Sequence, residues 1–376
     1  MQPWESIVVG AGPAGCAAAW DLAATGHSVL LLDRADFPRH KACAGGLTPK
    51  SLRALRYSVA PVVRQTVSTM VVESRRGEPA TLECRTTVCA MTVRQELDDF
   101  CLRQTLAMGA RFGRIGPILA IEQNRHEVLL RTAGQTFHAR FLVGADGVHS
   151  RVRTLVHGDA PPWFRRGFAL EAQVFPNGNT PDLVFDLAPV QYGYGWVFPK
   201  RDHLNVGLYT ESFDEKLDRA RLGRYIAERF GTAHAEPATG QFLGFGAENS
   251  PAPSGRVFLV GDAGGFADPL TGEGIHGAIA SGQAAAAAIH AHLEGNQPAG
   301  PAFAALTAPL RHGLRLSASG ARWFYRNPDL GFQALTAPVF RGAILNAFAN
   351  GTRIAALANA IRRFARVFAA GTRGVL

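Results

Sequence analysis

Apolar and polar positions over residues 5–33 follow one another in blocks that predict a strand, a turn, a helix and a second strand. The apolar run at 7–9 leads into the segment GAGPAG at 10–15, and an Ala/Leu-rich stretch then continues to Gly26. A second apolar run at 29–32 ends in Asp33. Short runs of this kind are typical of buried strands, whereas the longer stretch between them fits a helix.

The same patterning predicts further elements along the chain. Strands are expected at 67–73, 80–89, 128–131, 136–143, 168–175, 183–187, 196–198, 204–209 and 256–260. Helices are expected at 48–56, 94–108, 214–230 and 274–293. The alternating strands are typical of an antiparallel sheet that interrupts the first unit twice. We therefore expect an α/β protein with a discontinuous Rossmann-type domain at 1–66, 91–165 and 249–310, an inserted antiparallel sheet domain at 67–90 and 166–248, and a helical C-terminal region at 311–376.

Composition and charge narrow the classes of partner. The 376 residues are 47% hydrophobic and 18% charged, as in ordinary globular proteins. The net charge of +9 resides in residues 311–376, which hold ten arginines and one acid. No nucleic-acid-binding motif accompanies these arginines, so we expect no nucleic-acid partner. They flank apolar stretches at 334–348 and 354–368, and this basic face either meets anionic lipid headgroups or a pyrophosphate, or is simply solvated.

Two absences bear on location and on metals. The first residues, MQPWE, run straight into the first strand without an apolar leader, and no apolar run reaches the roughly 18 residues of a membrane-spanning helix. We therefore expect a cytoplasmic protein, with peripheral contact at the inner face of the membrane as an option. The five cysteines lack disulfide-type or metal-type spacing, and we predict no metal site.

The segment 10–15 has the G-x-G-x-x-G spacing of a dinucleotide-binding turn. Gly10 permits the tight turn, Gly12 lets the backbone approach a pyrophosphate, and Gly15 lets the helix pack closely on the strand. The helix start adds free N–H groups and a positive dipole end. Asp33 follows Gly15 by 18 residues, close to the roughly 20 expected for an acid that binds ribose hydroxyls. The unit therefore predicts nucleotide binding.

Two more glycine motifs follow in order, GADG at 144–147 and Gly261-Asp262. Together with the first fingerprint they make the chain resemble the flavoprotein hydroxylase-like superfamily, in which the three motifs bind FAD. The resemblance implies that Asp262 holds ribityl or ribose hydroxyls beside the pyrophosphate and that Asp146 braces the same region from the opposite side. It also implies that Arg94 lies over the dinucleotide as a fixed cation.

Glycines precede a predicted helix in the segment GDAGGFADPLTGEGI at 261–275. Outward-pointing N–H groups at such a helix start attract negative charge. A reduced, anionic flavin carries charge of this kind on its pyrimidine edge. We therefore expect the pyrimidine end of the flavin ring at 272–275.

Two further stretches are similar to signatures of geranylgeranyl reductases: KACAG at 41–45 and YGWVFPK at 194–200. The segment PLTGEGI at 269–275 matches the same family, and the resemblance spans about residues 5–300. The residues beyond are not identified by any motif.

The chain departs from that family pattern at two positions. A histidine, His276, follows the segment 269–275, where the family often has an aromatic residue such as tyrosine. We expect His276 near the active centre, which puts the substrate in doubt. Asp33 stands where a glutamate is more usual, and this change should alter adenosine contacts only slightly.

The family chemistry implies delivery of hydride from reduced FAD to a trisubstituted alkene of an isoprenoid chain, with a proton added to the other carbon. Such a substrate needs an apolar tunnel. Tyr194, Trp196 and Phe198 alternate along a strand and so share one face, either toward flavin and alkene or in a core stripe. The Cys43 thiol could gate the flavin or donate the proton, although a free thiol with a pKa of about 8.5 is a weak acid for this purpose.

These arguments select the site residues. Candidate catalytic residues are Cys43, Tyr194, Trp196 and His276. Candidate cofactor-binding residues are Gly10, Gly12, Pro13, Ala14, Gly15, Asp33, Arg34, Lys41, Cys43, Ala44, Gly45, Arg94, Asp146, Gly261, Asp262, Pro269, Gly272, Gly274 and Ile275. Lys41 and Lys200 either hold a pyrophosphate or are solvated. The expected cofactor is FAD, with NADPH or a ferredoxin-type protein as electron donor and an isoprenoid as substrate.

Other flavoprotein functions make different predictions. An aromatic hydroxylase shares the three FAD motifs and would consume oxygen with its substrate. A flavin halogenase would need a lysine near the substrate, and no lysine occurs from residue 51 to residue 199. A lipid-binding or flavin-storage protein would bind FAD without turnover. The resemblance favours the reductase.

Overall fold

A seven-stranded sheet contains the two strands on either side of the glycine-rich turn. The computed structural model of the protein describes residues 3–75, 77–178, 181–214, 216–253 and 255–350. The strands of this sheet are β1 (Trp4–Val9), β2 (Val29–Asp33), β8 (Arg111–Arg114), β9 (Ile118–Gln123), β10 (Val128–Thr132), β11 (Gln135–Gly144) and β18 (Val257–Leu259). The order is β8-β2-β1-β11-β10-β9, and β18 also pairs with β11. Because β1 is parallel to β2, β11 is parallel to β1, and β18 is parallel to β11, the carboxyl ends of these four strands meet at one edge.

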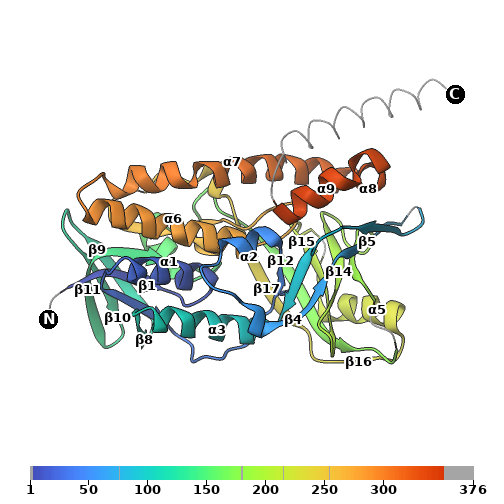
Figure 1. Ribbon diagram of the computed structural model, residues 1–376, viewed down its shortest axis with the longest axis horizontal. Coiled ribbons are helices and arrows are strands. Elements are labelled where there is room, and N and C mark those ends of the chain that lie inside the picture. The colour runs from blue at the N-terminus through green and yellow to red at the C-terminus, as the bar shows by residue number, and fades with distance from the viewer. Residues whose placement is uncertain (1–2, 76, 179–180, 215, 254, 351–376) are drawn as a thin grey trace, which may run out of the picture.

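Three helices cover one face of this sheet: α1 (Pro13–Ala24), α3 (Arg94–Ala107) and α6 (Ile275–Leu293) (Figure 1). Proline at the first position of α1 suits a helix start, since its φ is preset and its missing N–H is not needed. Small residues let α1 and α6 pack closely: a Cβ on Gly282 would lie 2.3 Å from the carbonyl oxygen of Ala14. Both helices begin at the edge where the parallel strands end.

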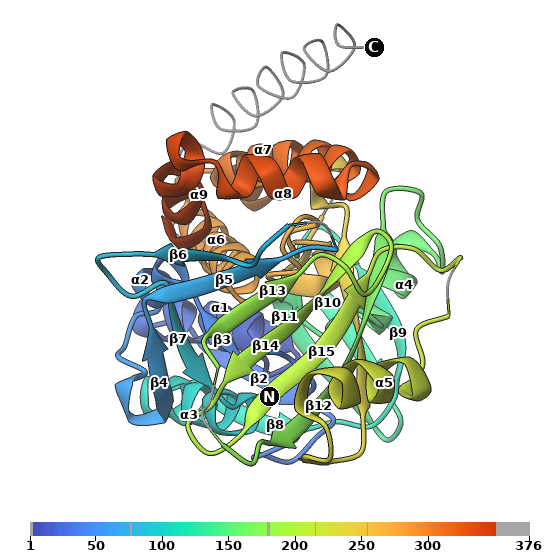
Figure 2. The ribbon, with the colours of Figure 1, turned by 90° about the vertical axis from the view of Figure 1, so that its right-hand side faces the viewer.

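A second sheet has eight strands and lies at the other end of the molecule (Figure 2). They are β5 (Thr69–Glu73), β6 (Ala80–Glu83), β12 (Arg165–Phe175), β13 (Leu183–Asp186), β14 (Gly193–Pro199), β15 (Leu204–Thr210), β16 (His234–Ala235) and β17 (Thr239–Phe245). The order is β16-β12-β15-β14-β13-β5-β6, with β17 on β12, and every pair is antiparallel except β13 with β5. Helix α5 (Arg219–Phe230) buries Leu222, Tyr225 and Ile226 against this sheet.

A three-stranded sheet and two short helices complete the region between the large sheets. The strands are β3 (Gly46–Leu47), β4 (Val63–Val67) and β7 (Cys89–Thr92), and the helices are α2 (Pro49–Ala54) and α4 (Arg151–His157). β3 follows the loop that carries Cys43, so the pairing of Gly46 with Met91 fixes where this loop ends.

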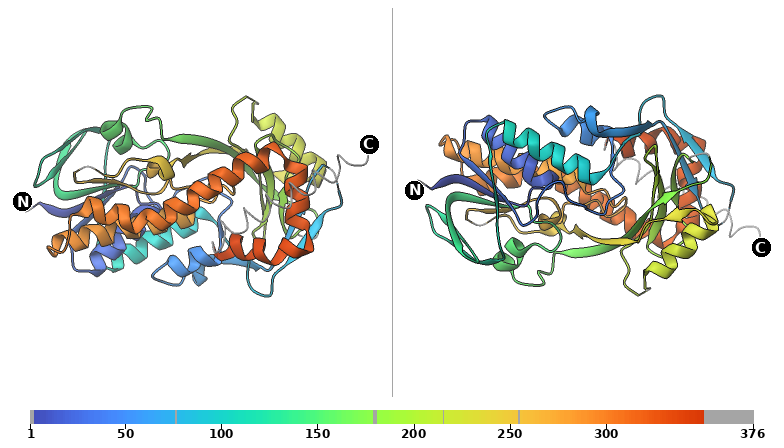
Figure 3. Two further views of the ribbon diagram at one scale, coloured as in Figure 1. Left: turned by 90° about the horizontal axis from the view of Figure 1, so that it is seen from above. Right: turned by 90° about the horizontal axis from the view of Figure 1, so that it is seen from below.

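Three C-terminal helices lie along the top of the molecule: α7 (Ala299–Arg326), α8 (Pro328–Thr336) and α9 (Pro338–Asn350) (Figures 1 and 3). α7 packs on α6 and extends beyond it toward the second sheet, where α8 contacts β5 and α9 contacts α2. The predicted α/β architecture with C-terminal helices is confirmed. Within the described residues, no helix combines the length and apolar character needed to cross a membrane.

The structure corrects several predicted boundaries. The run 67–73 is divided at Ser68, because β4 and β5 belong to different sheets, and the run 80–89 is likewise divided between β6 and β7. The helix expected from residue 214 begins at Arg219, since the Asp218 side chain accepts a hydrogen bond from the Arg221 N–H at 3.0 Å and caps it. The apolar stretch 334–348 is broken between α8 and α9 by Pro338.

The basic C-terminal region is only partly described. The stretch 354–368 and half of the ten arginines lie outside the described residues. Of the others, Arg311 donates to the carbonyl oxygen of Ser250, and Arg315 donates to that of Glu248 at 2.9 Å. These two side chains therefore attach α7 to the loop after β17.

Candidate active site

A cavity of about 1380 Å³ runs between the two large sheets. Its lining begins at the glycine-rich turn and β2, continues along the loop 39–46, and ends at the aromatic side chains of β13, β14 and β15. This volume exceeds the roughly 300–1,000 Å³ of ordinary small-ligand sites. The cavity therefore has room for a dinucleotide and a second molecule.

The glycine-rich turn has the geometry that its spacing predicts. Gly10 has φ +103°, and a Cβ there would lie 2.3 Å from the carbonyl oxygen of Ala145. A Cβ on Gly15 would lie 1.8 Å from the Gly10 carbonyl oxygen, so this glycine permits the close contact between α1 and β1. At Gly12 the nearest atom to a built Cβ is a guanidinium nitrogen of Arg39 at 3.8 Å. The backbone at Gly12 is therefore open to the cavity.

Asp33 fixes the turn as well as lining the cavity. One carboxylate oxygen accepts a hydrogen bond from the Ala11 N–H at 2.7 Å, and the other accepts one from the Ala35 N–H at 2.9 Å. The acid at the end of β2 thus holds the glycine-rich turn against the strand. Its contact with ribose hydroxyls stays a prediction.

Asp146 stabilises the start of a helix, a role that the sequence analysis did not predict. Its carboxylate accepts hydrogen bonds from the Ser150 hydroxyl at 2.5 Å, the Arg151 N–H at 2.7 Å and the Val152 N–H at 3.1 Å. These bonds cap the start of α4. Asp146 also lines the cavity, so its contact with the cofactor stays a prediction beside this capping role.

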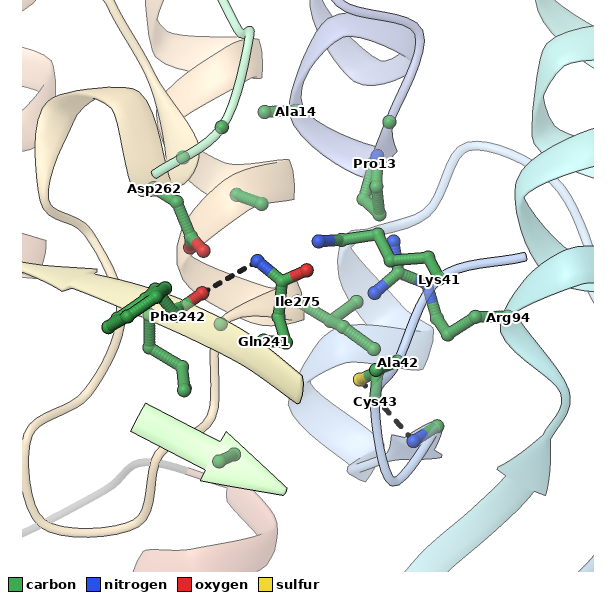
Figure 4. A pocket seen from close by; sticks show the side chains of 18 of the residues that line it. Pro13, Ala14, Lys41, Ala42, Cys43, Arg94, Gln241, Phe242, Asp262 and Ile275 are labelled. Atoms are coloured by element: carbon green, nitrogen blue, oxygen red, sulfur yellow. Dashed lines mark hydrogen bonds between the residues drawn. The ribbon is translucent and has the colours of Figure 1, made fainter. Parts of the chain in front are cut away.

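Charged groups face one another across the middle of the cavity, as Figure 4 shows for Lys41, Arg94 and Asp262. The Arg94 guanidinium donates to both carboxylate oxygens of Asp98, at 2.8 and 2.9 Å, and is buried. Burial lowers the pKa of Lys41, and the neighbouring Arg94 charge lowers it further. Burial raises the pKa of Asp262, while Lys41 opposes that rise. Lys41 lines the cavity and is not a solvated surface lysine.

The far wall of the cavity is aromatic. Tyr194, Trp196 and Phe198 of β14 share one face of their strand, as expected from their alternation, and all three line the cavity. The Tyr194 hydroxyl donates to the carbonyl oxygen of Thr271, and the Trp196 Nε1–H donates to Asn205 Oδ1 at 2.7 Å. Both rings are therefore held in place by hydrogen bonds.

The loop 39–46, which carries Cys43, is attached to the second sheet domain by two hydrogen bonds. The Cys43 N–H donates to Glu171 Oε1 at 2.8 Å, and the Lys200 ammonium donates to the Ala44 carbonyl oxygen. Lys200 is 2% exposed, so it neither is solvated nor lies in the cavity wall, contrary to both sequence-based options. Burial lowers its pKa to about 8, and burial raises the pKa of Glu171. Glu171, which the sequence analysis missed, lines the cavity.

The loop before α6 lines the cavity and is held by hydrogen bonds and an ion pair. Gly272 has φ +66°, and a Cβ there would lie 3.1 Å from the Tyr194 hydroxyl oxygen. The next side chain, Glu273, accepts hydrogen bonds from Thr48 at 3.1 Å and Ser51 at 2.9 Å and pairs with the Lys50 ammonium at 2.5 Å. Helix α2 therefore fixes this loop beneath the aromatic wall.

Three predicted site residues, Gly15, Pro269 and His276, do not line the cavity. Helix α6 begins at Ile275, which does line it, whereas the next residue, His276, does not. Burial lowers the pKa of His276, and the nearby Lys50 charge lowers it further. His276 is thus next to cavity-lining residues without lining the cavity itself, and its place near the active centre stays a prediction. Pro269 is buried in the turn that the Asp268 carboxylate holds, through its hydrogen bond from the Leu270 N–H at 2.9 Å.

Comparison with known proteins identifies the family. A family model described as an FAD binding domain matches residues 4–162. The chain is 30% identical to an uncharacterized protein of Methanosarcina barkeri, over 88% of this chain and 86% of that protein. It is also 30% identical to geranylgeranyl diphosphate reductase of Rhodobacter capsulatus, over 79% of this chain and 77% of that enzyme. The chain belongs to the geranylgeranyl reductase family. It is therefore an FAD-dependent oxidoreductase acting on CH–CH groups.

The fold agrees with this assignment. The crystal structure of a geranylgeranyl bacteriochlorophyll reductase-like protein from Thermoplasma acidophilum superimposes with a TM-score of 0.78, covering 96% of both chains at 20% identity. At this identity the likeness concerns the fold alone.

The residues of this reductase fit FAD on structural grounds. The open backbone at Gly12 lies at the start of α1, where N–H groups and the helix dipole favour a pyrophosphate. Lys41 supplies a cation on the same side of the cavity, and Asp262 supplies a carboxylate opposite it (Figure 4). Gly272, which has a positive φ, lines the cavity just before the start of α6.

The sequence analysis missed several groups that line the cavity of this reductase. They are Arg39, His40, His149, Glu171, Phe185, Tyr209, Gln241 and Phe242. Most lie in strands or loops without a recognisable motif, so only their place beside β14 and the glycine-rich turn reveals them. Glu171, the single acid in the strand β12, is the one signal that the sequence offered.

Proposed function

We propose that this reductase saturates C=C bonds in an isoprenoid chain. The observation that carries the proposal is the continuity of the cavity, whose glycine-lined half suits FAD and whose other half is formed by the rings of Phe185, Tyr194, Trp196 and Phe198. Rings of this kind favour an apolar chain over a polar substrate. The Rhodobacter capsulatus relative is named for geranylgeranyl diphosphate, and we propose a substrate of the same chemical class.

Each part of the cavity has a proposed task. The Gly12 backbone and Lys41 hold the pyrophosphate, Asp262 holds hydroxyls, and the backbone at 272–275 meets the pyrimidine edge. Reduced FAD, when bound, supplies the hydride. Trp196, fixed by its hydrogen bond to Asn205, orients the alkene and excludes water. One hydride and one proton add to the two alkene carbons, so each double bond gains two electrons and two hydrogens.

Glu171 is the residue best placed to supply the proton. It lies in the cavity wall, and burial raises its pKa, so it stays protonated at a higher pH than an exposed glutamate. Its Oε1 already accepts a hydrogen bond from the Cys43 N–H. We propose that the carboxyl proton of Glu171 reaches the alkene directly or through the Cys43 thiol, whose sulfur accepts a hydrogen bond from the Gly45 N–H at 3.4 Å.

Further proposals concern the domains, the electron donor and the C-terminal region. We propose that 1–66, 91–165 and 249–310 bind FAD, that 67–90 and 166–248 bind the substrate, and that NADPH or a ferredoxin-type protein supplies the electrons. We also propose that the basic apolar region at 311–376 contacts membranes that hold the substrate.

The proposal is tested by incubating the FAD-loaded enzyme with geranylgeranyl diphosphate and dithionite without oxygen. The product should gain 2 mass units for each bond reduced, because one H₂ equivalent is added per double bond. Unchanged geranylgeranyl diphosphate, together with a phenol that gains 16 mass units only when oxygen is present, would identify an aromatic hydroxylase instead.

A further inference from the structure

A group of polar side chains lies away from the cavity, where α1 and α6 end. His27 follows α1 in the turn before β2, His290 lies in the last turn of α6, and Glu294 caps α6. One ligand atom of each lies within 4.8 Å of the others. Because 263 residues separate His27 from His290, sequence spacing gives no sign of this group.

The two imidazoles face each other directly. His27 Nε2 lies 2.9 Å from His290 Nδ1, and the ring centroids are 5.2 Å apart. Two nitrogens that each bind one tetrahedral Zn²⁺ at about 2.0–2.1 Å lie roughly 3.3 Å apart. The observed separation therefore needs only a small widening to admit an ion.

A carboxylate orients the buried imidazole. Glu5 Oε1 lies 3.3 Å from His27 Nδ1, and the same carboxylate accepts a hydrogen bond from the Ser28 N–H at 2.7 Å. The His27 side chain is 6% exposed. With its Nδ1–H donated to Glu5, His27 presents the Nε2 lone pair to His290, which is the arrangement that commonly supports a metal-binding histidine.

The helices add a second reason for a cation here. α1 and α6 pack side by side, both begin at the cavity edge, and both end at this group (Figure 1). The carboxyl end of a helix carries roughly half a negative charge. Two such ends together with Glu294 and Glu5 make this corner attractive to a divalent cation.

We propose that His27, His290 and Glu294 form a Zn²⁺ site, with Glu5 as the group that positions His27. Two imidazoles and one carboxylate suit Zn²⁺, whereas Mg²⁺ and Ca²⁺ prefer oxygen ligands alone. The bound ion holds the turn after α1 against the end of α6. It thereby stabilises the two helices whose opposite ends form the FAD half of the cavity.

The test uses the full-length, FAD-loaded protein stripped of metal by chelation. Zn²⁺ titrated by calorimetry should bind at one site per chain, and it should raise Tm, whereas Mg²⁺ should leave Tm unchanged. Co²⁺ should give visible absorption bands of a tetrahedral site and compete with Zn²⁺.

Variants locate the site among the 12 histidines of the chain. His290→Asn and Glu294→Gln, neither of which is fully buried, should weaken Zn²⁺ binding at least tenfold and about threefold, respectively, while circular dichroism stays unchanged. His292→Asn, on the same helix, is the matched control and should bind Zn²⁺ as the wild type does. Undiminished Zn²⁺ binding by His290→Asn, or no stoichiometric binding by the wild type, would overturn the proposal.

Discussion

The Cys43 N–H donates a hydrogen bond to Glu171 Oε1 at 2.8 Å, so a carboxyl group of the second sheet fixes a loop of the nucleotide half across 128 residues of sequence. The same loop is held by Lys200 through the Ala44 carbonyl oxygen. Both groups are buried. The loop is therefore held by two buried groups of the second sheet domain, and one of them, Glu171, lines the cavity.

Replacing Glu171 by glutamine should slow alkene reduction without loss of flavin. The amide oxygen still accepts the Cys43 hydrogen bond, but the side chain can no longer give up a proton, and general acids of this kind contribute about 10²–10⁴-fold. The wild-type rate should fall as pH rises through the raised pKa of Glu171, because the acid form is then lost. Glu171→Gln should lack this limb of the pH profile.

The control for this variant is Glu228→Gln, which changes an exposed glutamate of α5 in the same sheet domain. Its rates should match those of the wild type at every pH. If Glu171→Gln also keeps the wild-type rate and pH profile, Glu171 is not the proton source.

Two glycines of the first turn should respond in opposite ways to a side chain. A Cβ at Gly12 meets nothing closer than Arg39 at 3.8 Å, so Gly12→Val should fold but bind no FAD, since the side chain occupies the path to the backbone. Gly10→Ala should instead destabilise the fold by more than about 2 kcal/mol, because φ is +103° and its Cβ would lie 2.3 Å from a backbone oxygen. Flavin absorbance after purification and Tm of the apoprotein distinguish the two outcomes. A flavin-loaded Gly12→Val variant would contradict the placement of the pyrophosphate.

The loop before α6 depends on Glu273 and not on its neighbour His276. Glu273→Ala removes the hydrogen bonds from Thr48 and Ser51 and should loosen the flavin contact, raising the Kd for FAD by about tenfold. His276→Asn should change the Kd for FAD and kcat by less than about threefold, since this side chain lies outside the cavity. Flavin fluorescence titration measures the first effect and steady-state turnover the second. A His276→Asn variant without activity would place His276 in the active centre.

Glu211 should make stability depend on pH. Burial raises its pKa to about 7, so folding favours the protonated form, and the associated stability is present below pH 4.5 and is lost as pH rises through 7. Glu211→Gln removes this dependence. The variant should be more stable than the wild type by about 1–3 kcal/mol at pH 8.5 and nearly equal to it at pH 5. Urea unfolding measures the free energy of unfolding of both proteins at pH 5 and at pH 8.5. If the variant differs from the wild type by the same amount at both pH values, the prediction is contradicted.

Much of the fold could be predicted because local patterns and tertiary structure agree. The strand–turn–helix–strand unit at 5–33 has apolar runs, glycines and an acid that all serve one geometry. The predicted element boundaries were wrong where tertiary structure decides them. For example, nothing in the local sequence at Ser68 shows that β4 and β5 belong to different sheets. β17 was missed because two glycines and a glutamine weaken its strand pattern.

The site was predictable only where a motif fixes the backbone. Gly10, Gly12 and Gly272 have conformations that glycine alone adopts easily or surroundings that need a bare backbone. Side chains were harder, because their direction depends on neighbours far away in sequence. Asp146 caps α4, and Lys200 lies under the Cys43 loop, although the motif positions of both suggested cofactor or phosphate contacts.

The central claim is that reduced flavin in this cavity gives its electrons to an isoprenoid alkene. The most direct measurement is stopped-flow absorbance of the anaerobically reduced, FAD-loaded enzyme mixed with geranylgeranyl diphosphate. The account predicts that the oxidised flavin spectrum returns without oxygen, with one flavin oxidised for each double bond reduced in the product. Flavin that stays reduced with the isoprenoid, yet is reoxidised quickly by oxygen once a phenol is added, would contradict it.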